Sequence, residues 1–262
     1  MKYTPAALLA IASLAARRAG EHVIANLDRR DETDSLSRHD VKHRLDVESQ
    51  EVATATILAA CPDYPILGEE TCDTPLPDAP AQWVIDPIDG TVNFFHGLPW
   101  WCSSVAIQAN GRSLAGAVYA PQLGLLFEAS IDTPALCNGI PITVSHIADP
   151  SLALIHTGAD KSDVSGRSFK FMRAIGAIAQ RMRITGAAAL DICMVAAGNA
   201  EAYFEPGIYL WDIAAARLIL ERAGGKCEIL RSYENYRMAV LTTNAVIHDR
   251  IKEELDPLFD HP

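Results

Sequence analysis

Residues 83–93, WVIDPIDGTVN, join an apolar run to two carboxylates that lie a few positions apart. The apolar residues before Asp86 predict a short buried strand. We expect this strand to end at Asp86, because Pro87 cannot donate a hydrogen bond within a sheet. The residues that follow predict a tight turn at Asp89, with Thr91 as the cap of a helical turn. Two carboxylates are therefore expected close together at the end of a strand.

This turn combines two kinds of group that suit a phosphate-binding site. Carboxylate oxygens are preferred ligands of Mg²⁺, and the backbone N–H groups of Gly90 and Thr91 suit phosphate oxygens. An Asp-rich surface turn is the competing interpretation. A calcium loop of the EF-hand kind is excluded. With Gly90 as its sixth residue it would begin at Ile85 and end at His96, and neither is a carboxylate.

Two further acidic residues stand where buried elements begin or end. Glu69 follows a predicted strand over 66–67, and Asp212 opens an apolar helix predicted over 212–222. Each alone fits an ordinary loop residue or helix cap. Together with Asp86 and Asp89 they supply four carboxylates, a number that suits a two-metal site with a shared ligand.

The rest of the chain predicts strands and helices that are mixed without strict alternation. Strands 104–108 and 114–119 flank Asn110-Gly111, a strong hairpin signal, and residues 125–127 are expected to add a third strand. Further strands are predicted at 152–156 and 202–205, and further helices at 47–60 (capped by Asp46), 168–180, 187–197 and 244–258, with Gly224 ending the helix 212–222. This mixture favours a layered α+β sandwich over a doubly wound sheet.

Composition argues against several classes of protein. The chain has 262 residues, of which 49% are hydrophobic, enough for one large domain or two packed halves. Its formal net charge of -11 argues against binding to a nucleic-acid backbone, since that partner requires basic patches. None of the six cysteines falls in a C-x-x-C pair, so reduced and mostly buried thiols are expected.

The N-terminal segment superficially matches a secretory signal, because Lys2 precedes the apolar run 6–16. Arg17 and Arg18 stand, however, where the cleavage segment would have to lie. The apolar pattern also continues at helical spacing as far as Leu27. We therefore expect an amphipathic first helix, a cytoplasmic protein and no segment that spans a membrane.

Three motifs, in order along the chain, resemble those of the inositol monophosphatase family. They are Gly68-Glu69-Glu70, then Asp86-Pro87-Ile88-Asp89-Gly90-Thr91 with Asn93-Phe94, then Trp211-Asp212 with Ala223-Gly224-Gly225. The likeness covers nearly the whole chain and implies a layered α/β/α/β/α sandwich of the inositol monophosphatase and fructose-1,6-bisphosphatase type. It also implies one phosphatase unit over 1–262. The N-terminal half, 1–145, would carry most metal ligands, and the C-terminal half, 146–262, would carry Asp212 and substrate contacts.

The same resemblance implies two Mg²⁺ ions, with a third, weaker ion near Glu69. The metal ligands would be Glu69, Asp86, the Ile88 carbonyl, Asp89 and Asp212, with Asp86 shared between two ions. The Gly90 and Thr91 amides would bind the phosphate. Water would be the nucleophile, acidified by Mg²⁺ and oriented by a pair formed by Thr91 and Asp46.

Substrate contacts are implied at Asp89, Gly186, Ala187 and Glu205, for a small phosphate monoester with myo-inositol monophosphate as the first candidate. The chain departs from the family pattern at His43, where a threonine is usual, and at Ala187, where many relatives carry a hydroxyl. His43 and Arg44 form a basic patch that could touch a second anionic group. Trp100-Trp101 could wall the pocket or pack in the core.

Several alternatives stay open on this scaffold. Histidinol phosphate, fructose 1,6-bisphosphate and 3′-phosphoadenosine 5′-phosphate are alternative substrates. A non-catalytic metal-binding regulator is the alternative of another class, and its sign would be the loss of a metal ligand or of the Thr91–Asp46 pair. A thiol enzyme would need a placed cysteine–histidine pair, which the sequence lacks. The resemblance further implies lithium sensitivity and a homodimer.

Overall fold

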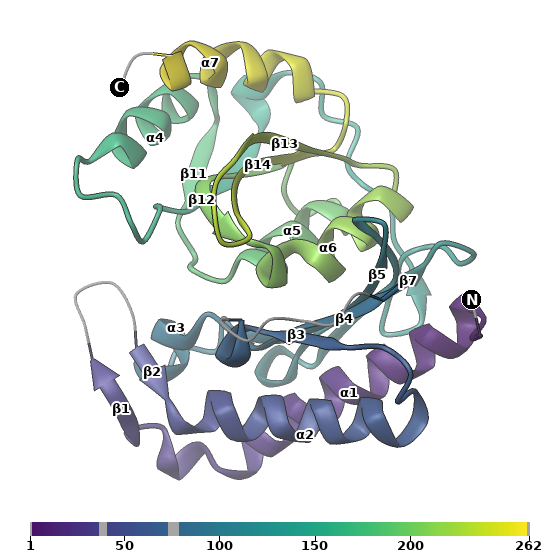
Figure 1. Ribbon diagram of the computed structural model, residues 1–262. Helices are drawn as coiled ribbons and strands as arrows, with labels where there is room; N and C mark the ends of the chain where they lie inside the picture. The colour runs from purple at the N-terminus through teal and green to yellow at the C-terminus, as the bar shows by residue number, and fades with distance from the viewer. Residues whose placement is uncertain (1, 37–40, 73–78, 261–262) are drawn as a thin grey trace.

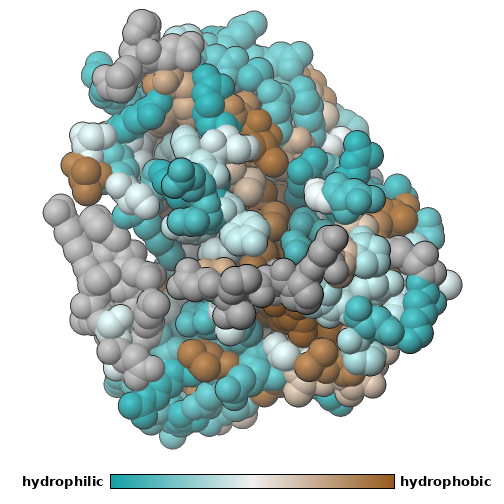
Figure 2. All heavy atoms as spheres, in the orientation of Figure 1, coloured by the Kyte–Doolittle hydropathy of each residue, from teal (hydrophilic) through white to brown (hydrophobic). Residues whose placement is uncertain are grey.

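The computed structural model describes residues 2–36, 41–72 and 79–260, and it stacks their helices and sheets in layers (Figure 1). Helices cover one side of a seven-stranded sheet, central helices lie between this sheet and a five-stranded sheet, and further helices cover the far side. The layered α+β sandwich predicted from the sequence is confirmed. On the face in Figure 2, hydrophilic residues dominate the surface, and apolar side chains show in separate patches between them.

The seven-stranded sheet has the order β3-β4-β5-β6-β7-β8-β9. Its strands are β3 (Ile66–Gly68), β4 (Gln82–Asp89), β5 (Cys102–Ala109), β6 (Arg112–Ala120), β7 (Leu125–Ser130), β8 (Leu136–Cys137) and β9 (Ile140–Pro141). Only the β3–β4 pair is parallel among these described strands. The predicted hairpin joins β5 and β6, and Asn110 and Gly111 have φ values of 50° and 72°. A two-residue turn of this hand requires positive φ at both positions.

Helix α1 (Pro5–Ala25) packs with α2 (Arg44–Ala60) on the outer face of this sheet. The buried side of α1 is rich in alanine, which lets the helix lie close to β5 and β6; Ala12, Ala15, Ala16 and Ala19 are fully buried there. The predicted first helix is thus confirmed. A short hairpin, β1 (Thr33–Leu36) and β2 (Val41–His43), connects the two helices. Among the described helices, none is both long and apolar enough to cross a membrane.

The five-stranded sheet has the order β11-β10-β12-β14-β13. Its strands are β10 (Leu154–Thr157), β11 (Arg181–Arg183), β12 (Ala202–Tyr209), β13 (Lys226–Ser232) and β14 (Arg237–Thr243). Helices α5 (Ala188–Ala196) and α6 (Leu210–Arg222) fill the layer between the sheets, and α4 (Arg167–Ile178) and α7 (His248–Asp260) cover the outside. The largest core cluster lies around α5 and α6, so the central layer ties the two halves together.

Two helix starts differ from the prediction because other side chains satisfy the first N–H groups. Helix α2 begins at Arg44 rather than at 47, and His43 is its cap, since the His43 Nδ1 accepts the Leu45 N–H at 3.0 Å. Asp46 therefore lies in the first turn and is not the cap. Helix α7 begins at His248 rather than at 244, because the Asn244 side chain accepts the N–H groups of Val246 and Ile247 in a preceding turn.

Other boundaries agree more closely. Gly224 has φ 92° and follows the end of α6, as the prediction of a glycine stop requires. Strand β12 extends to Tyr209, four residues beyond its predicted end, with an irregularity in its pairing after Glu205. None of the six cysteines, all of which lie in the described part of the chain, forms a disulfide, and Cys61, Cys102 and Cys193 are buried, which agrees with the expectation of reduced thiols.

Candidate active site

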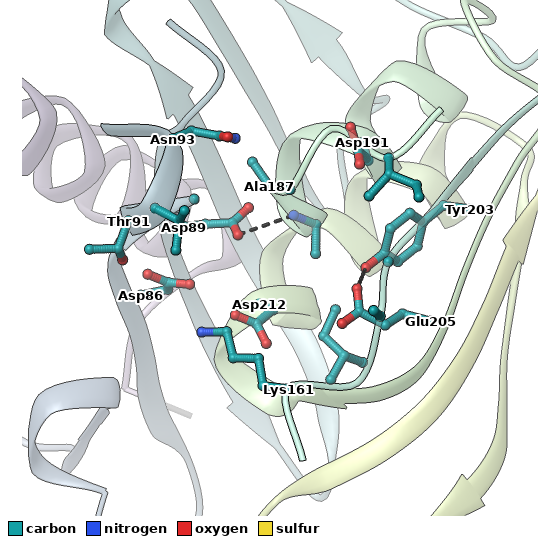
Figure 3. Close-up of a pocket in the computed structure, with 18 of the residues that line it drawn as sticks. Asp86, Asp89, Thr91, Asn93, Lys161, Ala187, Asp191, Tyr203, Glu205 and Asp212 are labelled. Carbon is teal, nitrogen blue, oxygen red and sulfur yellow. Dashed lines mark hydrogen bonds between the residues drawn. The ribbon is translucent and has the colours of Figure 1, made fainter. Parts of the chain in front are cut away.

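A cavity of about 230 Å³ lies between the two halves of the chain, and both halves line it (Figure 3). Nearly all the predicted site residues border it, namely Glu69, Asp86, Ile88, Asp89, Gly90, Thr91, Gly186, Ala187, Glu205 and Asp212. Asp46 is the predicted site residue that does not. The three motifs, whose outer members lie more than a hundred residues apart in the sequence, therefore meet at one cavity.

Strand β4 runs on through Pro87 to Asp89, whereas the sequence predicted that it would end at Asp86. Its pairing with β5 is irregular between Asp86, opposite Ser104, and Asp89, opposite Cys102. An uninterrupted strand would turn residues three apart to opposite faces. A bulge re-aims side chains, and here it lets both carboxylates face one cavity.

The turn after β4 leads into the short helix α3 (Thr91–Phe95), and its cap is Gly90 rather than the predicted Thr91. Gly90 has φ 93°, in the left-handed region that glycine adopts without steric cost. Thr91 is the first helical residue, and its hydroxyl donates a hydrogen bond of 2.9 Å to the Ile88 carbonyl. The turn is thus fixed by backbone conformation and by one side-chain bond.

Asp86, Asp89 and Asp212 form a compact group, with one oxygen of each within 4.8 Å of the others. Asp212 comes from the first turn of α6, where one oxygen also accepts the Tyr209 N–H at 2.8 Å. Asp89 accepts the N–H groups of Ala188 and Ala189, at 3.1 and 2.7 Å, at the start of α5. Two helix N-termini therefore hold two of the three carboxylates in place.

Burial and mutual repulsion raise the pKa values of this group. The pKa of Asp86 is raised by burial and then by the charges of Glu69, Asp89 and Asp212. Burial also raises the pKa of Glu69 to about 7. Both Asp86 carboxylate oxygens are buried without a hydrogen-bond partner among the described residues. A buried carboxylate without a hydrogen-bond partner is costly, and a divalent cation with oxygen ligands would satisfy it.

The metal-free protein should lose stability as pH rises from about 5 to about 8. Burial raises the pKa of Glu69 from 4.5 to about 7 and that of Glu205 from 4.5 to about 8. Over this window the unfolded chain releases protons that the folded chain still holds, so the free energy of unfolding falls with pH. A pKa that differs by one between the folded and the unfolded chain is equivalent to about 1.4 kcal/mol. Thermal unfolding in a chelator across this range should show a falling Tm, and a flat Tm would contradict these raised pKa values.

The predicted pair of Thr91 and Asp46 is not hydrogen-bonded in the described part of the chain. The Thr91 hydroxyl donates to Ile88, and both Asp46 oxygens are buried without a hydrogen-bond partner. Burial, and then the charge of Glu69, raises the pKa of Asp46. Asp46 is therefore buried outside the cavity lining, but it is close enough to Glu69 for that charge to raise its pKa.

The opposite wall of the cavity carries Glu205 and Tyr203 of β12 and Asp191 of α5. The Tyr203 hydroxyl donates a short hydrogen bond to Glu205. Burial raises the pKa of Glu205 to about 8, and the charge of Asp212 adds to this increase. This wall offers hydroxyl and carboxyl groups, which suit the hydroxyls of a small polar molecule.

The structure shows the contacts of three residues whose roles the sequence left open. The His43 ring is buried, caps α2, and meets Phe94 edge-on at 5.2 Å. Trp101 is fully buried in the core, and its Nε1 donates to Gln122 at 2.6 Å. Trp100 does not line the cavity, but its Nε1 donates to Asp191 at 3.0 Å. Of the two interpretations of this pair, core packing fits Trp101.

The sequence interpretation missed Asp191 and Lys161, both of which line the cavity. Asp191 also lies 2.8 Å from His156 Nδ1 and accepts a short hydrogen bond from Thr185. A carboxylate in the middle of the apolar helix 187–197 was a usable signal, because buried charges require partners. Lys161 lies in a polar loop, where no such signal exists.

Comparison with known proteins gives a consistent result. The model of the inositol monophosphatase family matches residues 5–256. The protein named Nus factor SuhB of Pasteurella multocida is 37% identical over 222 residues, 83% of each chain. Inositol monophosphatase 2 of Saccharomyces cerevisiae is 34% identical over 206 residues, 73% of this chain and 70% of its own.

Solved structures agree with these sequence relatives. The inositol monophosphatase of Anabaena (Nostoc) sp. PCC 7120 superimposes with a TM-score of 0.81 at 31% identity, covering 94% of each chain. Mycobacterium tuberculosis SuhB superimposes with a TM-score of 0.84 at 29% identity, covering 98% of each chain. The similarity thus extends over the whole layered fold and over the elements that carry the cavity.

Proposed function

This chain belongs to the inositol monophosphatase family, as its motifs predicted, and on that premise we propose that it is a Mg²⁺-dependent phosphatase of small phosphate monoesters. The observation that carries the proposal is the convergence of acidic side chains from three separate segments on one cavity, namely Glu69, the bulge of β4 and the start of α6. We propose that the halves 1–145 and 146–262 act as one unit, because each supplies part of this wall.

Glu69, Asp86, the Ile88 carbonyl, Asp89 and Asp212 would hold the ions, with Asp86 shared. Asp86 fits this role because its buried oxygens lack hydrogen-bond partners among the described residues. When bound, Mg²⁺ would neutralise the carboxylates, attract the phosphate and make a neighbouring water more acidic. The N–H groups of Gly90 and Thr91, at the start of α3, would orient the phosphate oxygens.

Asp46 and Thr91 would orient the attacking water and take its proton. The raised pKa of Asp46 makes it a better proton acceptor than an ordinary carboxylate. The role requires the Thr91 hydroxyl to exchange its bond to the Ile88 carbonyl for one to the water. This exchange involves one side-chain hydroxyl and leaves the turn's backbone unchanged.

The substrate wall favours a polyol as the leaving group. Glu205 and Tyr203 already share a hydrogen bond, and Asp191 lies on the same side. Substrate hydroxyls can replace or extend such bonds, and Gly186 and Ala187 would add backbone contacts. We therefore place myo-inositol monophosphate first. Histidinol phosphate, fructose 1,6-bisphosphate and 3′-phosphoadenosine 5′-phosphate follow as alternatives.

A non-catalytic role is the competing proposal, and several relatives carry the name Nus factor. The chain keeps every predicted metal ligand together with Thr91 and Asp46, whereas a regulator would be free to lose them. We therefore favour catalysis. The cytoplasmic location and the homodimer stay predictions.

Release of inorganic phosphate from the four named esters tests this proposal. We expect turnover in Mg²⁺, none in chelator, and the highest kcat/KM for inositol monophosphate. Lithium at millimolar concentration should inhibit. If another of these esters had the highest kcat/KM, that ester would replace inositol monophosphate as the proposed substrate. If no ester released phosphate in Mg²⁺, the non-catalytic role would be favoured.

A further inference from the structure

Lys161 is the only lysine or arginine among the described residues that line the cavity, and six carboxylic side chains line the same cavity. Figure 3 shows its amine pointing toward Asp86 and Asp212, at the place where the acidic group converges. Lys161 attracts Asp212, Glu69 and Glu205 electrostatically, and it opposes the rise that burial causes in their pKa values. One ammonium group thus stabilises the ionised form of several carboxylates.

The loop that carries Lys161 is held against the five-stranded sheet by the residue before it, Asp160. Asp160 forms an ion pair of 2.6 Å with Arg237 of β14, and one of its oxygens accepts the Ser162 N–H at 2.8 Å. A Cβ at Gly207 would lie 2.2 Å from the Asp160 carboxyl carbon, so only glycine lets the loop approach so closely. These contacts hold the Lys161 backbone at the cavity while the residue itself stays exposed.

We propose that Lys161 is a built-in counter-cation of the acidic group, which competes with divalent cations for the same carboxylates. Glu69 and Asp212 are two of the proposed metal ligands, and both line the cavity together with Lys161. An ammonium on a long, exposed side chain can leave when a more highly charged ion arrives. Lys161 would then weaken metal binding in the free protein and stabilise the metal-free state.

This inference rests on the proposed metal site, and it differs from a role in binding phosphate. A counter-cation acts before any phosphate is present, so its removal should change metal affinity in the free protein. A phosphate contact would leave that affinity unchanged and weaken the binding of inorganic phosphate. The two roles therefore predict opposite patterns for one substitution.

Titration of chelator-treated protein with Mn²⁺ in the absence of phosphate, followed by calorimetry, distinguishes them. Lys161→Met keeps the length of the side chain and removes the charge. We expect it to bind Mn²⁺ about tenfold more tightly than the wild type, as removal of one nearby charge implies. The gain should shrink at high ionic strength. The metal-free variant should also show a lower Tm, because the carboxylates lose their counter-charge.

Lys170→Met is the matched control, because Lys170 is an exposed lysine of α4 that does not line the cavity. It should leave Mn²⁺ affinity at the wild-type value. Equal affinity in the wild type and Lys161→Met would overturn the counter-cation role, and weaker phosphate binding by that variant would then identify a phosphate contact. If no form of the protein bound Mn²⁺, both the metal site and this inference would fall. If the wild type and Lys161→Met both bound Mn²⁺ with the same affinity, the metal site would stand and only the counter-cation role would fall.

Discussion

Asp86→Asn is expected to lower phosphate release by roughly 10³-fold or more, the scale of losing several kcal/mol of transition-state stabilisation. Asp86 is the proposed shared ligand, and an amide cannot supply the negative charge or the second anionic oxygen of a bridging carboxylate. The fold should survive, because the Asp86 oxygens make no hydrogen bond among the described residues. Near-normal turnover would contradict the bridging role.

The same substitution should stabilise the metal-free protein. Burial and three neighbouring carboxylates raise the pKa of Asp86, so its ionisation at neutral pH costs free energy that Asn does not. We expect a gain of about 1 kcal/mol or more in the free energy of unfolding in chelator, and loss of Mn²⁺ binding in the same variant. Asp132→Asn, the same chemical change at an exposed turn residue, should alter neither property.

The parts of the site that the sequence predicts are those attached to regular elements. Glu69 and Asp86 each follow an apolar run, and Asp212 precedes one; such a run predicts both the element and the side on which it meets the core. The Asn110-Gly111 hairpin and the Gly224 stop follow from backbone preferences that belong to single residues. These features are local, so one sequence is enough to predict them.

The failures have a common cause in contacts between segments that are far apart in the sequence. His43 and Asp46 both suit the start of α2, and His43 is the cap in the structure, with its ring packed edge-on against Phe94, far along the chain. Pro87 is tolerated within β4 because the pairing with β5 is irregular there. Lys161 reaches the cavity through the Asp160–Arg237 ion pair, which joins segments that share no pattern. Such contacts depend on tertiary structure.

Asp89→Asn should remove activity to a similar extent but, unlike Asp86→Asn, should destabilise the metal-free protein. The Asp89 carboxylate accepts two N–H groups at the start of α5, from Ala188 at 3.1 Å and from Ala189 at 2.7 Å, one with each oxygen. Asn has one acceptor oxygen, so its NH₂ group would face an N–H and leave that donor unsatisfied in a buried place. Such a loss costs about 1–3 kcal/mol.

Thermal unfolding of the two variants in chelator gives a direct comparison, since the chemical change is the same and the positions are three residues apart. Asp89→Asn also removes the repulsion between Asp89 and Asp212, which by itself would raise the Tm. The net Tm decrease of this variant therefore measures by how much the lost hydrogen bond to α5 outweighs the relief of repulsion. Asp149→Asn is the control for the chemistry, because Asp149 accepts the Ser151 N–H at 2.9 Å on an exposed turn, where water can replace the bond. A Tm increase for Asp89→Asn equal to that for Asp86→Asn would show that Asp89 acts only as a charge and that α5 does not depend on it.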